Sequence, residues 1–281
     1  MKGNPKFLKQ DLNFWADIRF ISQTVGYTQR GADVIKIPTI EEISDRYEKE
    51  HLSSSHIAVR GDPTDYGQLI SDYFTYRADV LNRQVRNLFM NAHEASDTFY
   101  NLYNKVNPDE KLPLPKNKQT GSKRDFAFLT CLVNLLIYQE LGSNWTNCDY
   151  DPRSLTLITE DGRPFRTLSR RLDGAYPSSV NPELVWEIKE YYYTTTFGSR
   201  VADGVYETLV DGLELKEVNN SLSKHVHHLL IIDSYSVWWE QGKSYLCRMI
   251  DMLNMGMVDE IIFGKEVLDR IPAILKEIQA Q

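Results

Sequence analysis

The segment RRLDGAYPSSVNPELVWEIKE, residues 170–190, decides the fold class because a compact apolar run lies between its polar ends. The run LVW follows a proline and contains β-branched and aromatic residues, so it predicts a short buried strand over 184–189. Side chains two residues apart on a strand leave the same face, which directs Glu187 and Lys189 into one site. Asp173 is expected beside them, at the end of the preceding strand.

These residue types suit hydrolysis of a phosphodiester bond. Two carboxylates can hold one or two Mg²⁺ ions, which prefer oxygen ligands. Such a metal acidifies a bound water and neutralises charge on the phosphate, and a nearby ammonium group can align that water. We therefore expect Asp173 and Glu187 to bind metal and Lys189 to position the nucleophile. The structural alternative is an ion pair between Glu187 and Lys189, with Asp173 in a turn.

Acidic residues two positions before a lysine are common, and the chain has two further triplets of this kind, at 109–111 and 214–216. The first lies in a proline-flanked loop and the second near a predicted helix end. Only the copy at Glu187 follows an aspartate expected on a strand.

Asp173 followed by Glu187-Ile188-Lys189 resembles the PD-(D/E)XK nuclease superfamily, although Leu172 stands where many members have proline. The resemblance covers roughly residues 122–263. It implies an α/β fold that is restriction-endonuclease-like, with a mixed central sheet flanked by helices in the order helix, three strands, helix, strand. It also implies Mg²⁺-dependent cleavage of double-stranded DNA, most simply by a homodimeric type II restriction endonuclease whose two-fold symmetry matches a symmetric target.

The composition is that of a soluble globular protein, with 42% apolar and 25% charged residues among 281. No apolar run approaches the length of a membrane span, and we expect a cytoplasmic protein without membrane contact. The net charge of -7 argues against indiscriminate nucleic-acid binding but permits a local basic groove. Three cysteines without CxxC spacing are expected to be reduced structural thiols.

A segment rich in proline and lysine, 107–121, predicts a linker. It would separate an N-terminal helical region, 1–120, used for dimerisation or DNA recognition, from a nuclease core with a C-terminal extension, 121–281. Apolar periodicity over 64–104 predicts either one long helix or two with a break near 93–96.

In the core, a helix is expected over 122–141, followed by a hairpin with an Asp-Gly turn whose second strand, 165–172, delivers Asp173. The apolar run 229–232 predicts a strand in the centre of the sheet. Further patterns predict a strand at 260–263 and helices at 199–212, 244–253 and 267–278.

Other residues are candidates for the site. Glu140 continues the buried stripe of the first core helix and is a possible third metal ligand; a frayed, exposed helix end is the alternative. Basic and hydroxyl side chains near the proposed metals could contact DNA phosphates, or could be solvated surface charges. They are Arg166, Arg170, Arg171, Lys123, Arg124, Ser199 and Arg200.

We assign no catalytic role to two polar clusters. Asp203, Glu207 and Asp211 form a stripe along the predicted helix after residue 199, which we assign mainly to solvent. His225 and His227 would share one face of a strand, but without a paired cysteine or carboxylate motif a metal site there is not favoured.

Two other functions remain open from the sequence. One is a repair or phage-defence nuclease that acts on structured or modified DNA. The other is a non-catalytic helical protein-interaction module in which Glu187 and Lys189 form only an ion pair. Both nuclease hypotheses require Asp173, Glu187 and Lys189 to converge in one concave cleft with a basic rim.

Overall fold

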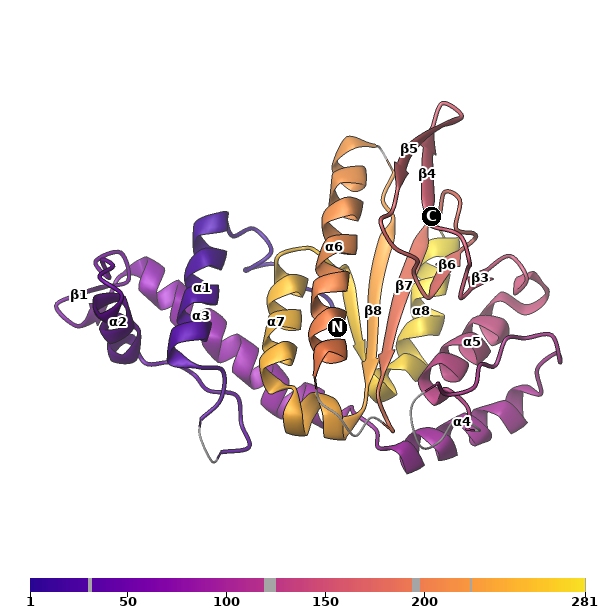
Figure 1. The fold of residues 1–281 in the computed structure, drawn as a ribbon, viewed down its shortest axis with the longest axis horizontal. Coiled ribbons are helices and arrows are strands. Elements are labelled where there is room, and N and C mark those ends of the chain that lie inside the picture. The colour runs from indigo at the N-terminus through magenta and orange to yellow at the C-terminus, as the bar shows by residue number, and fades with distance from the viewer. Residues whose placement is uncertain (30–31, 119–124, 194–197, 223, 281) are drawn as a thin grey trace.

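The computed structural model describes residues 1–29, 32–118, 125–193, 198–222 and 224–280. It has a mixed α/β fold in which helices cover both faces of a five-stranded sheet, and a helical N-terminal region extends from one side (Figure 1). Within these ranges, no helix is both long and apolar enough to cross a membrane.

The N-terminal region contains helices α1 (Leu12–Val25), α2 (Ile40–Lys49) and α3 (Asp65–Asp79), with a short β1–β2 hairpin (Ala58–Val59 and Asp62–Pro63). After α3 the chain continues through a π-helical turn, Val80–Gln84, and a 3₁₀ turn, Val85–Asn87, before α4 (Ala92–Val106). The periodic stretch therefore forms two helices.

The break lies between α3 and α4, over residues 80–91, and the expected 93–96 fall inside the first turns of α4. The side chain of Asn91 accepts a hydrogen bond from the backbone of Glu94, whose carboxylate accepts one from Asn91 in return. This reciprocal capping satisfies two backbone donors at the start of α4 and fixes where the helix begins.

The sheet has the strand order β3-β6-β7-β8-β9. The strands are β3 (Asp149–Tyr150), β6 (Gly174–Tyr176), β7 (Leu184–Glu190), β8 (His227–Asp233) and β9 (Glu260–Phe263). The first three strands are antiparallel, whereas β7, β8 and β9 run parallel through the crossover helices α6 (Ser199–Ser221) and α7 (Lys243–Asn254). The strands predicted at 184–189, 229–232 and 260–263 are thus confirmed.

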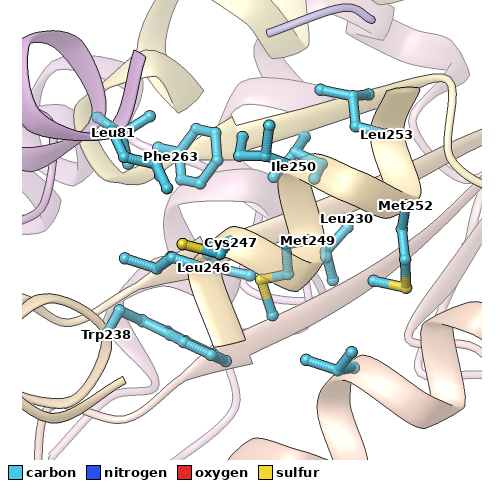
Figure 2. Packing of buried hydrophobic residues seen from close by; sticks show 14 of the residues in the cluster. Leu81, Leu230, Trp238, Leu246, Cys247, Met249, Ile250, Met252, Leu253 and Phe263 are labelled. Carbon is cyan, nitrogen blue, oxygen red and sulfur yellow. The ribbon is translucent and has the colours of Figure 1, made fainter. Parts of the chain in front are cut away.

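Alternation along β7 separates two layers. Trp186 and Ile188 pack with α5 (Phe128–Leu141) and α8 (Val267–Gln279), while Val185 packs with α6 on the opposite face. Side chains of α7 complete that second layer, where Leu246, Met249 and Ile250 belong to one apolar cluster with Leu230 of β8 (Figure 2). Glu187 and Lys189 belong to the face covered by α6.

The expectation that the 155–172 hairpin delivers Asp173 is wrong. Strands β4 (Leu157–Glu160) and β5 (Arg163–Thr167) do form a hairpin, and Asp161 and Gly162 in its turn have φ values of 50° and 74°. However, β5 is largely exposed and lies in a separate two-stranded sheet. Asp173 instead directly precedes β6. Its backbone N–H donates to the carbonyl of Trp186, which joins it to the main sheet.

The expected division near residue 120 falls between two helices that pack together. Phe99 of α4 contacts Phe128 of α5, with ring centroids 5.8 Å apart, in one apolar cluster. Helix α3 is joined to α7 by a buried ion pair in which Arg77 Nη1 donates to Asp251 Oδ1 at 3.0 Å. Contacts therefore link the helical region to the sheet layers.

Candidate active site

Glu187 and Lys189 lie side by side on β7, as the strand alternation predicts. Lys189 Nζ donates to Glu187 Oε1 at 2.5 Å and to Glu207 Oε2, on α6, at 2.6 Å. Burial disfavours the charged ammonium, but these two carboxylates outweigh that effect and raise the pKa of Lys189 well above its usual range. Lys189 is therefore a cation at neutral pH.

Asp173 is held against the same strand. Its Oδ2 accepts a hydrogen bond from the backbone N–H of Ile188 at 2.7 Å. The next residue, Gly174, lies so close to the Trp186 ring that a Cβ atom there would come within 2.0 Å of it. Burial, together with the charge of Glu187, raises the pKa of Asp173 to about 7, although the Ile188 N–H opposes this.

Arg170 connects the strand to α6. Its Nη2 donates to Glu187 Oε1 at 2.8 Å and to Glu207 Oε2 at 3.3 Å, and its Nη1 donates to Asp211 Oδ2 at 2.7 Å. The guanidinium thus binds three carboxylates within the protein instead of facing outward as a phosphate ligand. Burial raises the pKa of Asp211 to about 7, and Arg170 only partly offsets this.

The assignment of the α6 carboxylates mainly to solvent is wrong for Asp211, and Glu207 is only partly exposed. Asp211 is fully buried and Glu207 reaches Lys189, while Asp203 remains exposed. The spacing of four residues put Glu207 and Asp211 on one helix face, but periodicity alone does not show which face covers β7. Arg170 and Lys189, which lie before and on β7, were the available sign that carboxylates of α6 face this strand.

Asp173, Glu187 and Lys189 line one cavity of about 650 Å³. This volume is within the range of small-molecule and cofactor sites. Its walls also carry exposed basic side chains from two other segments, namely Lys116, Lys118 and Arg153. The three residues of the sequence motif therefore converge in a concave site with basic groups at its edge.

Glu190 also lines this cavity, but its oxygens bind the start of α5. Its Oε2 accepts from the backbone N–H of Leu129 at 2.8 Å and its Oε1 accepts from the Thr130 hydroxyl at 3.0 Å. Burial raises the pKa of Glu190 to about 7. Glu190 was not identified from the sequence, and its contacts assign it to fixing α5 against β7.

Glu140 lies in the last turn of α5, whereas Glu190 in the cavity wall contacts the first turn of that helix. Glu140 Oε2 lies 3.5 Å from Lys276 Nζ of α8, and Glu140 is not among the described residues that line the cavity.

The other predicted DNA contacts are placed as follows. Arg166 forms ion pairs with Glu214 and Glu217 of α6, and Arg171 is exposed. Neither is among the described residues that line the cavity. Ser199 and Arg200 form the first turn of α6. Their side chains, and the whole of Lys123 and Arg124, lie outside the described part of the chain.

Comparison with known protein families gives two matches. A model described as a domain of unknown function, DUF7687, matches residues 90–278, which is more than half of the chain. The chain belongs to the DUF7687 family. The DUF7687 match includes every residue that we place in the cavity, and a second model, DUF7690, also a domain of unknown function, matches residues 1–84. No curated protein and no solved structure matches the chain.

Proposed function

We propose that this protein is a Mg²⁺-dependent DNA endonuclease of the PD-(D/E)XK type, most simply a type II restriction endonuclease. The observation that carries the proposal is the convergence of Asp173, Glu187 and Lys189 in one cavity with basic residues on its walls. Its substrate would be double-stranded DNA, and a symmetric target would call for a homodimer.

The order of elements supports this proposal. Helix α5, strands β3, β6 and β7, helix α6 and strand β8 follow one another in the chain. The three strands are antiparallel and β8 joins β7 in parallel. The resemblance to the PD-(D/E)XK superfamily leads us to expect the order helix, three strands, helix, strand, and the observed order supports the proposal if the β4–β5 hairpin between β3 and β6 is taken as an insertion.

Asp173 and Glu187 fit a divalent cation. Glu187 Oε2 is buried and has no hydrogen-bond partner among the described residues, although a buried acceptor without a partner is costly. The charge of Glu187 also disfavours ionisation of Asp173. Carboxylate oxygens are the ligands that Mg²⁺ prefers, so these two residues would hold it. When bound there, Mg²⁺ would acidify a water molecule and neutralise charge on the scissile phosphate.

The remaining side chains have separate roles in this proposal. Lys189, held as an ammonium by Glu187 and Glu207, can donate a hydrogen bond to the attacking water but does not act as its general base. Arg170 occupies Glu187 Oε1 and so orients that carboxylate while its Oε2 stays available. The exposed lysines and arginine at the cavity edge would contact the DNA backbone.

The test compares cleavage of supercoiled and linear DNA in the presence of Mg²⁺ by wild type, Asp173→Ala and Lys189→Ala. We expect discrete fragments from wild type and a loss of about 100-fold or more in rate for each variant, as when one preorganised electrostatic group is removed. Lys111→Ala is the matched control, because Lys111 ends another acidic-x-Lys triplet but is exposed and outside the cavity lining.

Two outcomes would redirect the proposal. If wild type leaves unmodified DNA of varied sequence intact but cleaves modified or branched DNA, the protein is a repair or defence nuclease and not a restriction enzyme. If neither substrate is cleaved and Mg²⁺ does not bind, the nuclease proposal is wrong.

A further inference from the structure

A second cluster of potential metal ligands lies at the other end of the parallel strands. His227 begins β8 and Asp259 directly precedes β9. Since His227 pairs with Leu184 of β7, the cluster is about 16 Å along the strands from Lys189. His225 precedes β8 and is not part of it, so the expectation that both histidines lie on a strand holds only for His227.

The side chains of His225, His227 and Asp259 converge. One ligand atom from each lies within 4.8 Å of the others. His225 Nε2 is 2.9 Å from Asp259 Oδ1, and the two imidazole rings contact edge to face with centroids 4.6 Å apart. An ion pair between His225 and Asp259 would explain only two of these three positions, since it gives no reason for a second imidazole beside the first.

The backbone fixes the carboxylate in this orientation. The N–H of His228 donates to Asp259 Oδ2 at 2.8 Å, and the N–H of Asp259 donates to the carbonyl of His228 at 3.0 Å. Only Oδ1 is therefore directed at the histidines. His227 and Asp259 also line a small cavity of about 30 Å³. That volume is sufficient for a water molecule, which needs roughly 10–15 Å³.

We propose that His225, His227 and Asp259 bind one transition-metal ion of the Zn²⁺ class. Zn²⁺ takes imidazole nitrogen and carboxylate oxygen at about 2.0–2.2 Å in a tetrahedral arrangement, which places ligand atoms about 3.3 Å apart. The three ligand atoms here lie within 4.8 Å of one another, and His225 Nε2 is 2.9 Å from Asp259 Oδ1, so small side-chain adjustments would bring them to that spacing. The fourth position belongs to water in the adjoining cavity.

The ligand types distinguish this site from the proposed Mg²⁺ site. Imidazole suits Zn²⁺, Cu²⁺ and Ni²⁺, whereas Mg²⁺ and Ca²⁺ select oxygen ligands. A metal ion here would tie the segment after α6 to the segment before β9, at the end of the parallel strands opposite to Lys189. Binding of this metal ion does not depend on whether the protein cleaves DNA.

The experiment measures Zn²⁺ binding to chelator-treated, full-length protein by calorimetry and by the visible spectrum of bound Co²⁺. Wild type is expected to bind one equivalent with a tetrahedral Co²⁺ spectrum. His225→Ala and His227→Ala should each weaken Zn²⁺ binding by about 100-fold or more, beyond the loss typical for an outer-shell partner. His93→Ala is the control, because His93 is an exposed histidine on α4.

The proposal is overturned if the His225→Ala/His227→Ala double variant binds Zn²⁺ as tightly as wild type. It is also overturned if binding disappears in Asp173→Ala and persists in the histidine variants, because the ion would then occupy the other site. Urea unfolding without metal checks that each variant folds. The spectrum of Cu²⁺ bound to wild type supplies a readout without any variant: nitrogen couplings in electron paramagnetic resonance support the histidine site, and their absence contradicts it.

Discussion

At the scale of single residues, the charges around β7 do not balance. Four carboxylates, those of Asp173, Glu187, Glu207 and Asp211, share the site with two cations, Arg170 and Lys189. Full ionisation would leave two uncompensated negative charges in a partly buried cluster. Burial raises the pKa of both Asp173 and Asp211 to about 7, which reduces this negative charge in part. A divalent cation would supply the missing charge.

The raised pKa of Asp173 makes stability depend on pH. Because its pKa is about 7 in the folded protein and near 3.8 without structure, the folded state binds more protons between these values. The free energy of unfolding therefore falls as pH rises from about 4 to about 7, by at most about 1.4 kcal/mol per pH unit for one group. We expect urea unfolding to show a shallower pH dependence for Asp173→Asn than for wild type.

Mg²⁺ provides the complementary measurement. A metal that binds the ionised carboxylates should raise the melting temperature of wild type more at pH 8 than at pH 5, and should do so much less for Asp173→Asn. Asp211 and Asp233, whose pKa values are also raised to about 7 by burial, contribute the same pH trend in both proteins. If the free energy of unfolding changed equally with pH in wild type and Asp173→Asn, the raised pKa of Asp173 would be contradicted.

At the scale of elements, substitutions at two glycines of α6 can test how closely this helix packs on its neighbours. A Cβ atom at Gly212 would lie 2.2 Å from the carbonyl oxygen of Met257, whereas at Gly204 the nearest atom is Lys189 Cε at 3.4 Å. Both changes to alanine gain about 1 kcal/mol of helix propensity. We expect Gly204→Ala to be neutral or stabilising and Gly212→Ala to destabilise by about 1–3 kcal/mol through overpacking.

Thermal and urea unfolding of the two variants measure this difference. Since both glycines lie in the same helix, propensity is matched and only the contact differs. Equal effects on stability would show that α6 does not approach the segment before β9 as closely as described.

The elements that could be predicted from the sequence are those whose own residues indicate that they are buried. The apolar run before Glu187 identified β7, and the run at 229–232 identified β8, because a strand buried on both faces has no polar alternation. Prediction from the sequence failed where the position of a residue depends on a partner far along the chain. Asp173 was attached to the wrong strand because a three-residue strand such as β6 has too little pattern to recognise.

The same limit applies within the site. Asp173, Glu187 and Lys189 were placed together from a local motif, and they do line one cavity. The burial of Asp211 and the contact of Glu207 with Lys189 follow from how α6 crosses the sheet, which the stripe of carboxylates did not specify. Asp259 was not associated with the histidines because only the parallel pairing of β8 with β9 brings it near them.

At the scale of the whole molecule, the regions matched by the two family models share buried polar contacts. Arg77 of α3 is fully buried, and Asp251 of α7 accepts hydrogen bonds from it and from the Tyr73 hydroxyl. Removing one partner of a buried ion pair leaves the other charge without compensation, at a cost of about 3–5 kcal/mol. Arg77→Met should therefore destabilise the entire chain by that amount.

Urea unfolding checks this prediction. We expect one transition for wild type, seen at the same urea concentration by tryptophan fluorescence, which includes Trp15 of α1, and by circular dichroism. Arg83→Met is the control, since Arg83 lies in the following turn and is mostly exposed. Two separate transitions in wild type would mean that the helical region unfolds independently.

The chain order of the candidate active site has a consequence for its assembly. Six of the charged groups around β7 come from one continuous segment between residues 170 and 211: Arg170, Asp173, Glu187, Lys189, Glu207 and Asp211. Loop-closure entropy grows with the length of chain between contacting groups, and here no two successive members are separated by more than 18 positions. Bringing the cluster together therefore costs little conformational entropy, whereas the parallel strands that support it require far longer loops to close.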